Sequence, residues 1–348
     1  MQPLRERACS RVGGTLLIAV LAASAPRAAA ETAVGDTSVG GKIFLDASHL
    51  DSRARSGRHI GSGVDLTRFY LDVDHRFSGV WSTHLTTDIN WLRDEAPTDL
   101  WVKRAYLQGA FSKALVLRLG AADLPWMAYV NQWAGYRYVD NELTGRLKVA
   151  NSTDWGVHVS GALGTRSQWQ YATAVVSGSS YKRPRTGASP DVELRLGWQP
   201  TAHTVLALGS YRGRRALDGG EHVAWHTAQR WDAMAAYANE RFRLGAQFFR
   251  ADNWNQVRSP LADAARGWSA WSSLQLAPQW AVFARHDDAH VSLRRDPSRR
   301  DRYDSLGLEY RWSRNLQLAI VARRQRLADR DGVVTDANEL GVWTQIAF

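Results

Sequence analysis

The sequence NELGVWTQIAF at residues 338–348 alternates strictly between two kinds of side chain. One face carries Leu340, Val342, Thr344, Ile346 and Phe348, and the other carries Glu339, Gly341, Trp343 and Gln345. A period of two is typical of a β-strand with one apolar and one polar face. The chain therefore ends in a predicted strand whose last residue is an aromatic on the apolar face.

Similar alternating runs recur along the chain, and together they predict an all-β fold. Sixteen strands are expected, at residues 39–50, 63–77, 80–92, 99–112, 114–121, 153–165, 167–178, 190–199, 203–213, 227–239, 241–252, 265–276, 280–290, 302–313, 315–327 and 338–348. Short turns alternate with polar loops such as 51–62, 179–189, 214–226, 253–264 and 291–301. An even number of strands with this alternation of connections is typical of a transmembrane antiparallel β-barrel.

The spacing of Trp81 and Trp91 tests whether these strands could cross a membrane. Both residues fall on one face of a single predicted strand. Ten residues rise about 33 Å, and a tilt of about 40° projects this to about 25 Å, the height of the apolar band between aromatic girdles. A soluble β-sandwich also places aromatics at alternate positions. The number and length of the strands favour the membrane barrel.

The opposite faces of the predicted strands are polar, which suits a water-filled interior. A barrel of this strand number is wide enough to hold an aqueous channel. Basic residues that the alternation places on the inner face are Arg68, Arg104, Arg118, Arg195, Arg311 and Arg323.

The first thirty residues are typical of an export signal. Arg5, Arg7 and Arg11 precede an apolar run at 12–23, and small residues at 28–30 supply a cleavage site. The domain prediction is a signal peptide at 1–30, a short periplasmic segment at 31–38 and a barrel at 39–348. Cleavage would remove the only cysteine, Cys9, so no disulfide is expected. No later apolar run reaches the length of a membrane-spanning helix.

The net charge of the whole chain is +10, and it falls to +7 when residues 1–30 are removed. A basic excess suits nucleic acid, a membrane surface or an acidic solute. Because the arginines are distributed over a predicted barrel, we expect small anionic solutes and no nucleic acid. The run of arginines between 294 and 302 falls in an external loop, where lipopolysaccharide phosphates or water would meet it.

The longest connection, residues 122–152, is rich in aromatic and basic side chains. A loop of this length inside a compact fold is usually functional. Because an aromatic loop is poorly suited to water, we expect it to fold into the barrel and constrict it, although it could instead lie across the rim or at a subunit interface. Its candidate solute-path residues are Tyr136, Arg137, Tyr138, Arg146 and Lys148.

Motifs of enzymes and cofactor sites are missing from the sequence. It contains no GxSxG, HExxH, GxGxxG or phosphate-binding glycine loop. His286, Asp287 and Asp288 are close in sequence, but a solvated strand end accounts for them. No catalytic residue, metal or cofactor is expected.

Several motifs resemble the phosphate-selective porin family, the porins related to porins O and P. They are a charged strand at 63–77, the Lys-Arg-Ala-Tyr-Leu run at 103–107, the Leu-Arg-Leu-Gly run at 117–120 before Pro125 and Trp126, and the Asp-Trp-Gly-Val run at 154–157. The final aromatic, Phe348, also resembles the assembly signal of bacterial outer-membrane barrels. The resemblance implies a trimeric, 16-stranded porin with an inward constriction loop. The chain departs from the family in one respect: phosphate-selective members have a lysine-rich lumen, and this chain has only five lysines.

Together these observations predict an outer-membrane porin that prefers anions, with phosphate as the solute that the family implies. Its expected partners are outer-membrane lipids, lipopolysaccharide, the barrel-assembly machinery and two further copies of the chain. An outer-membrane barrel enzyme, or a structural or adhesion barrel, is the alternative.

Overall fold

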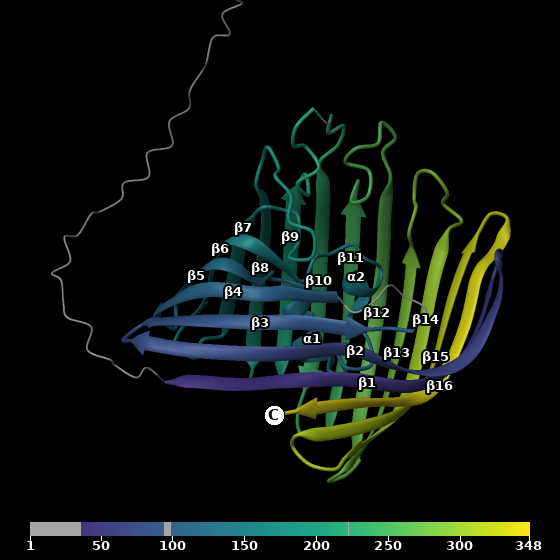
Figure 1. Cartoon of the computed structure of the whole chain (residues 1–348), viewed down its shortest axis with the longest axis horizontal. Coiled ribbons are helices and arrows are strands. Elements are labelled where there is room, and N and C mark those ends of the chain that lie inside the picture. Colours follow the sequence, from purple (N-terminus) through teal and green to yellow (C-terminus); the bar gives the residue numbers. More distant parts are fainter. Residues whose placement is uncertain (1–35, 94–98, 222) are drawn as a thin grey trace, which may run out of the picture. The chain divides into compact units, whose positions relative to one another are not determined.

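The computed structural model describes residues 36–93, 99–221 and 223–348. Sixteen strands form one closed antiparallel barrel in which each strand pairs with its neighbours in sequence, and β16 pairs with β1 (Figure 1). The barrel expected from the sequence is therefore confirmed. The predicted signal peptide lies outside the described residues.

The elements follow one another with few interruptions. The strands are β1 Thr37–Ala54, β2 Gly57–Ser78, β3 Trp81–Trp91, β4 Asp99–Ser112, β5 Leu115–Asp123, β6 Thr153–Leu163, β7 Trp169–Val176, β8 Asp191–Thr201, β9 Thr204–Gly213, β10 Ala228–Ala238, β11 Phe242–Asp252, β12 Ala264–Ala277, β13 Trp280–His290, β14 Arg300–Arg311, β15 Leu316–Asp329 and β16 Gly332–Ala347. Two helices, α1 Met127–Ala134 and α2 Leu143–Arg146, lie between β5 and β6. Among the described residues, no helix is long and apolar enough to span a membrane.

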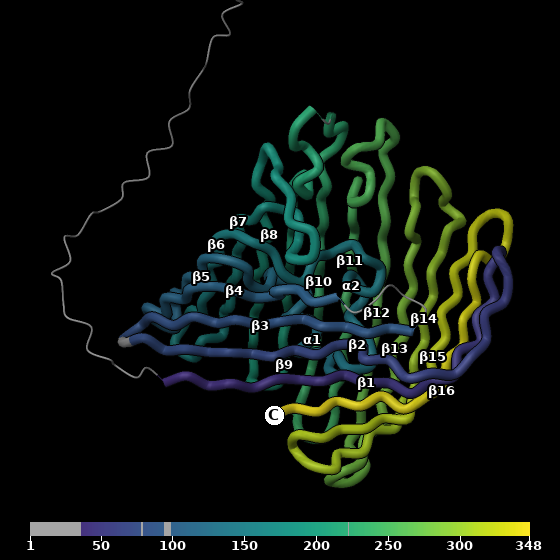
Figure 2. The backbone as a smooth tube through the Cα atoms, viewed as in Figure 1, coloured from purple at the N-terminus to yellow at the C-terminus, as the bar shows by residue number. Residues whose placement is uncertain are grey.

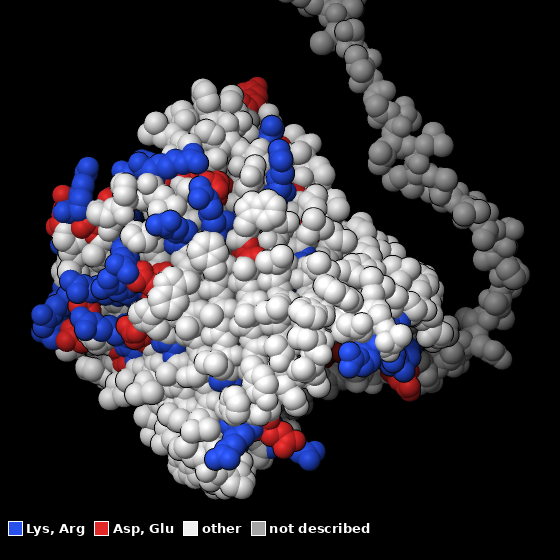
Figure 3. Space-filling model, turned by 180° about the vertical axis from the view of Figure 1, so that it is seen from behind, with Lys and Arg blue, Asp and Glu red and all other residues white. Residues whose placement is uncertain are grey.

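The two faces of each strand meet different surroundings, as strand β9 illustrates. Val205 and Ala207 point inward and are buried, whereas Leu206 and Leu208 point outward and are exposed. Figure 3 shows broad uncharged areas on the outer surface between groups of charged side chains. A large exposed apolar surface is costly in water and suits contact with lipid tails.

The connection at residues 51–62 is different from the expected polar loop. Strands β1 and β2 continue through it as a long hairpin that turns at Arg55 and Ser56 (Figure 2). Polar pairs across the hairpin, such as Arg58 Nη2 with Asp51 Oδ2 at 2.7 Å, support this register. Gly57 has a φ of 137°, which favours glycine. Strand β16 likewise begins at residue 332, six residues earlier than expected.

The barrel closes where β16 meets β1. The Phe348 N–H donates to the Gly41 carbonyl at 3.2 Å, and the Phe348 carbonyl accepts from the Gly41 N–H at 3.0 Å. A Cβ at Gly41 would lie 2.4 Å from the Tyr70 carbonyl oxygen and 2.6 Å from the Phe348 ring. Only glycine therefore fits at position 41. Strand β1 begins at Thr37, slightly before the predicted barrel boundary at residue 39.

Candidate functional site

Residues 124–152, called the lumen loop below, lie inside the barrel (Figure 1). The first half of the loop contains α1 and packs against inward positions of β9, β10 and β12. Its buried side chains Trp126, Tyr129, Val130 and Trp133 form one cluster with Val205, Ala207, Met234, Ala236 and Trp271. The loop therefore folds inward and does not lie across the rim.

The second half of the lumen loop reaches a different part of the wall. Tyr138 and Val139 cluster with Phe44 of β1, Phe283 of β13 and Trp343 of β16. The loop thus contacts both the β9–β12 wall and the β13–β1 wall, and it crosses the interior. Such a crossing narrows the space left for a solute.

Two of the predicted loop residues, Tyr136 and Tyr138, hold the loop against the wall. The Tyr136 ring stacks on Phe283 with 3.9 Å between ring centroids. The Tyr138 hydroxyl donates to Glu309 Oε2 at 3.2 Å, and Tyr138 is buried. Both rings contribute to the anchoring of the loop.

Four arginines of the wall donate to backbone carbonyls of the lumen loop. Arg195 of β8 donates to Pro125 at 3.0 Å, Arg230 of β10 to Val149 at 3.1 Å, Arg285 of β13 to Asn141, and Arg323 of β15 to Val139 at 3.3 Å. These four are called the wall arginines below. A loop without regular secondary structure has unpaired carbonyls, which must find donors when buried. The wall arginines supply these donors.

Sequence reasoning identified Arg195 and Arg323 but missed Arg230 and Arg285. Arg230 is fully buried and pairs with Glu193 at 3.1 Å and with Asp232 at 2.8 Å. Asp232 lies two positions from Arg230 on the same strand face, and Arg285 has the same relation to Asp287. This i, i+2 pairing of opposite charges on an inward face was the available signal.

Arg146 occupies a buried anchor of the lumen loop. Its guanidinium pairs with Asp287 Oδ2 at 2.8 Å and Asp301 Oδ1 at 2.7 Å, and its side chain is 7% exposed. Asp287 and Asp288 are both buried, so the expected solvated strand end at 286–288 was wrong for these two residues. Arg146 is thus compensated by two carboxylates.

The other predicted inward arginines divide into paired and unpaired groups. Arg68 lies 3.9 Å from Asp88, Arg104 bonds Asp123 at 2.9 and 2.7 Å, Arg311 bonds Glu309 at 2.5 Å, and Arg323 bonds Glu339 at 2.7 Å. Arg118 instead bonds Gln108 at 2.8 Å and faces the Tyr106 ring. Within the described residues, no ion pair is seen for Arg118 or Arg195.

A polar cavity of about 390 Å³ lies below the lumen loop, at the end of the barrel that carries the short turns. Arg137, Arg243 and Arg311 line it together with Glu309 and the amides of Gln275, Gln317 and Gln345. Among the described residues, Arg137 and Arg243 have no ion-pair partner, and the same holds for the exposed Lys148. This part of the interior offers cations and hydrogen-bond donors to a solute.

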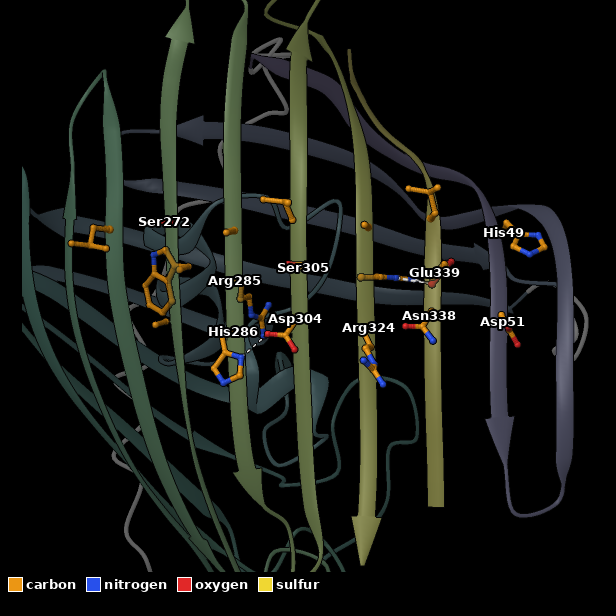
Figure 4. A pocket seen from close by; sticks show the side chains of 18 residues that line it. His49, Asp51, Ser272, Arg285, His286, Asp304, Ser305, Arg324, Asn338 and Glu339 are labelled. Carbon is orange, nitrogen blue, oxygen red and sulfur yellow. Dashed lines mark hydrogen bonds and ion pairs between the residues drawn. The ribbon is translucent and has the colours of Figure 1, made fainter. Parts of the chain in front are cut away.

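The outer face has a shallow depression, called the outer hollow below (Figure 4). It spans β11 to β16 and β1 and contains polar side chains in a single cross-strand row: His286, Asp304, Arg324 and Asn338. His286 Nδ1 lies 2.6 Å from Asp304 Oδ1. His286 is six residues from Trp280 along β13, or about 15 Å in height, inside an apolar band of about 25 Å.

Metal chemistry has no evident site in the part of the chain described. No group of three or more His, Cys, Asp or Glu side chains there could hold a metal ion. The polar groups of the interior are arranged as ion pairs and carbonyl contacts along the wall.

The geometry defines a class of fold: a porin-like closed β-barrel whose interior is crossed by one anchored loop. Solved structures with this fold include the outer-membrane channel DcaP of Acinetobacter baumannii, with a TM-score of 0.66 and 11% identity over 91% of this chain and 99% of that one. OprB of Pseudomonas putida has a TM-score of 0.66 and 11% identity over 90% of this chain and 94% of that one. The trimer form of OmpT of Vibrio cholerae has a TM-score of 0.58 and 13% identity over 90% of this chain and 99% of that one. No family model and no curated protein matches the sequence.

Proposed function

We propose that the chain forms a water-filled channel in the bacterial outer membrane and that the channel prefers small anions. The closed barrel, its polar interior and its fold relatives support a channel. The proposed role is passive transport and not catalysis. In such a channel, fixed cations replace part of the hydration lost by an anion, and weak binding at several sites permits release.

The observation that carries the anion preference is a set of interior guanidiniums that have no carboxylate partner among the described residues. Most interior arginines are compensated by carboxylates, but Arg118, Arg137 and Arg243 have no ion pair among the described residues. Because these groups lie in a partly desolvated interior, salt screens them less than external charges. These guanidiniums, which lack a carboxylate partner among the described residues, are therefore the groups that favour an anion in the interior.

Planar-bilayer recordings in a salt gradient test this function. We expect a reversal potential that indicates anion over cation permeability. A non-conducting or cation-selective protein would contradict the proposal. Adding phosphate to chloride solutions tests the solute implied by the family resemblance, since a bound phosphate would reduce chloride current in a saturable way.

We also propose that the chain assembles as a homotrimer. OmpT of Vibrio cholerae has a trimer form. In this chain, the row of the outer hollow places the polar side chains of His286, Asp304 and Arg324 at a height where exposure to lipid tails is costly. Contact with a second copy would remove that cost.

Lipopolysaccharide and the barrel-assembly machinery are the remaining proposed partners. Arg53 of β1 and Arg326 of β15 flank Asp336 on the outer face, near the end with long loops. Asp336 is already paired with Arg324 at 2.7 Å, so both flanking guanidiniums can bind lipid phosphates. Phe348, at the end of the closing strand, is the proposed signal for the assembly machinery.

A further inference from the structure

Two irregularities in the strand ladder aim basic side chains at one place in the interior. On β4, the register with β3 shifts between Thr86 and Thr87, which leaves Lys103 as an extra residue beside Arg104. On β2, the register with β3 shifts between Leu66 and Phe69, a stretch that contains Arg68. Bulges commonly re-aim a side chain next to a functional site. Here they turn Lys103 and Arg68 inward on strands that flank β3.

Lys103 is buried without a carboxylate. It is 7% exposed, and its Nζ donates to the Tyr70 hydroxyl at 3.0 Å and lies 4.4 Å from the centroid of that ring. No carboxylate of the described residues lies within ion-pair distance of it. Lysine is seldom fully buried unless paired, and an ammonium has three hydrogens to donate. Lys103 therefore retains donor capacity, and no ion pair compensates its charge within the described part of the chain.

A third cation reaches the same place from the external loop between β7 and β8. The hydroxyl of Tyr181 in this loop donates to Asp88 Oδ2 of β3 at 2.6 Å, which holds the loop against the wall. The neighbouring Lys182 has its Nζ 3.8 Å from the centroid of the Trp101 ring of β4. Burial lowers the pKa of Lys182, and the charge of Arg68 lowers it further.

Asp88 is the carboxylate shared by this group. Its Oδ1 lies 3.9 Å from Arg68 Nε, and that oxygen accepts no hydrogen bond. Among the described residues, three cations thus face one anion, which leaves two positive charges without a carboxylate at the end of the interior that carries the long loops. A monovalent anion would compensate only part of this excess.

We propose that Arg68, Lys103 and Lys182 form an entrance site that binds doubly charged oxyanions in preference to singly charged ones. This inference rests on the proposed function and deepens it, because it assigns a specificity to the mouth of the channel. Charge-assisted hydrogen bonds from an ammonium to an oxyanion are among the stronger polar contacts in proteins. Sulfate is a suitable probe since its charge does not change near neutral pH.

The test compares two variants that remove the same charge. Lys103→Met with Lys182→Met removes two entrance-site cations, and Lys113→Met with Arg166→Met removes two exposed cations from short turns. Calorimetric titration of the folded protein in detergent with sodium sulfate gives the dissociation constant. We expect it to rise about tenfold or more in the entrance-site variant, as loss of one charged hydrogen bond implies, and to change less than about twofold in the control.

Several further results decide the proposal. The single variant Lys103→Arg, which keeps the charge, should retain most of the sulfate affinity of the wild type. Heat-modifiable gel mobility establishes that each variant is folded. Equal affinities in both double variants, no sulfate binding by the wild type, or equal binding of sulfate and formate would each overturn the site. Bilayer recordings separate this from the proposed function: a cation-selective wild type with intact entrance-site binding would defeat anion transport and leave the site standing.

Discussion

At the scale of single residues, the interior separates cations that hold the loop from cations that remain available. The alternation of the strands placed six arginines on the inner face but did not single out Arg230 and Arg285, which also lie there. It could not predict their partners, because a pair such as Arg146 and Asp287 joins residues 141 positions apart. The sequence also gave no sign that Arg195 and Arg323 would donate to carbonyls of the lumen loop.

Replacing Arg146 by Met should weaken the attachment of the lumen loop. The change leaves Asp287 and Asp301 without a guanidinium in a buried place, and breaking a buried pair in this way costs about 3 to 5 kcal/mol. Limited proteolysis of the folded barrel should then cut within residues 124–152. Arg250→Met, which removes an exposed arginine paired with Asp252, is the control. Resistance equal to that of the control would count against the anchoring role.

Replacing Arg137 and Lys148 by Gln should lower the anion selectivity. Neither has an ion-pair partner in the described structure, and both belong to the lumen loop. Reversal potentials should show the ratio of anion to cation permeability falling by roughly twofold or more, since interior charges are poorly screened. Arg295→Gln with Arg299→Gln in an external loop removes equal charge and should have little effect. Equal effects of the two pairs would show that net charge alone sets selectivity.

At the scale of elements, period-two patterns located the strands well because each strand has one apolar and one polar face. The expected loop at 51–62 was wrong since both of its faces are polar, and nothing in the pattern separates a polar hairpin from a coil. The helices α1 and α2 were also not anticipated. They are short, and their burial depends on contacts with strands far along the chain.

The external loop that contains Asp263 should open at low pH. Burial raises the pKa of this carboxyl, but hydrogen bonds from Ser292 at 2.6 Å and from the Arg294 N–H at 3.0 Å outweigh it and hold the pKa below 3.8. Because the folded pKa is the lower one, this stabilisation is complete above the unfolded value and is lost as the pH falls through the folded value. Hydrogen exchange, corrected for intrinsic rates, should show less protection of the Arg294 amide as the pH is lowered below 3.8. Asp263→Asn should remove most of that pH dependence.

Deleting Phe348 should impair assembly of the barrel. The residue makes two backbone hydrogen bonds with Gly41 and so extends the β1–β16 ladder to the end of the chain. An open seam leaves two strand edges unpaired, so we expect the yield of heat-modifiable folded protein to fall about fivefold or more. Phe77→Ala removes another exposed aromatic ring and serves as the control. Similar yields from both proteins would argue against a special role for the terminal residue.

At the scale of the whole molecule, the outer hollow connects the barrel to its proposed trimer. Replacing His286 and Asp304 by Leu removes the polar pair from the outer face and should convert the trimer to monomers in analytical ultracentrifugation. Ser210→Leu with Arg212→Leu on the outer face of β9 is the matched control, because this pair lies outside the row. A variant that stays trimeric would place the subunit interface elsewhere.

The wall arginines also bear on the order of events during biogenesis. They belong to β8, β10, β13 and β15, all of which follow the lumen loop in the sequence. The loop therefore cannot dock fully until nearly the whole chain has been threaded into the membrane, and contacts between distant residues form late. Until the loop docks, it does not cross the interior and does not narrow the space inside the barrel. We expect a short-lived intermediate that is more permeable to solutes than the finished barrel, and it ends when Arg323, the last wall arginine in the sequence, donates to the Val139 carbonyl.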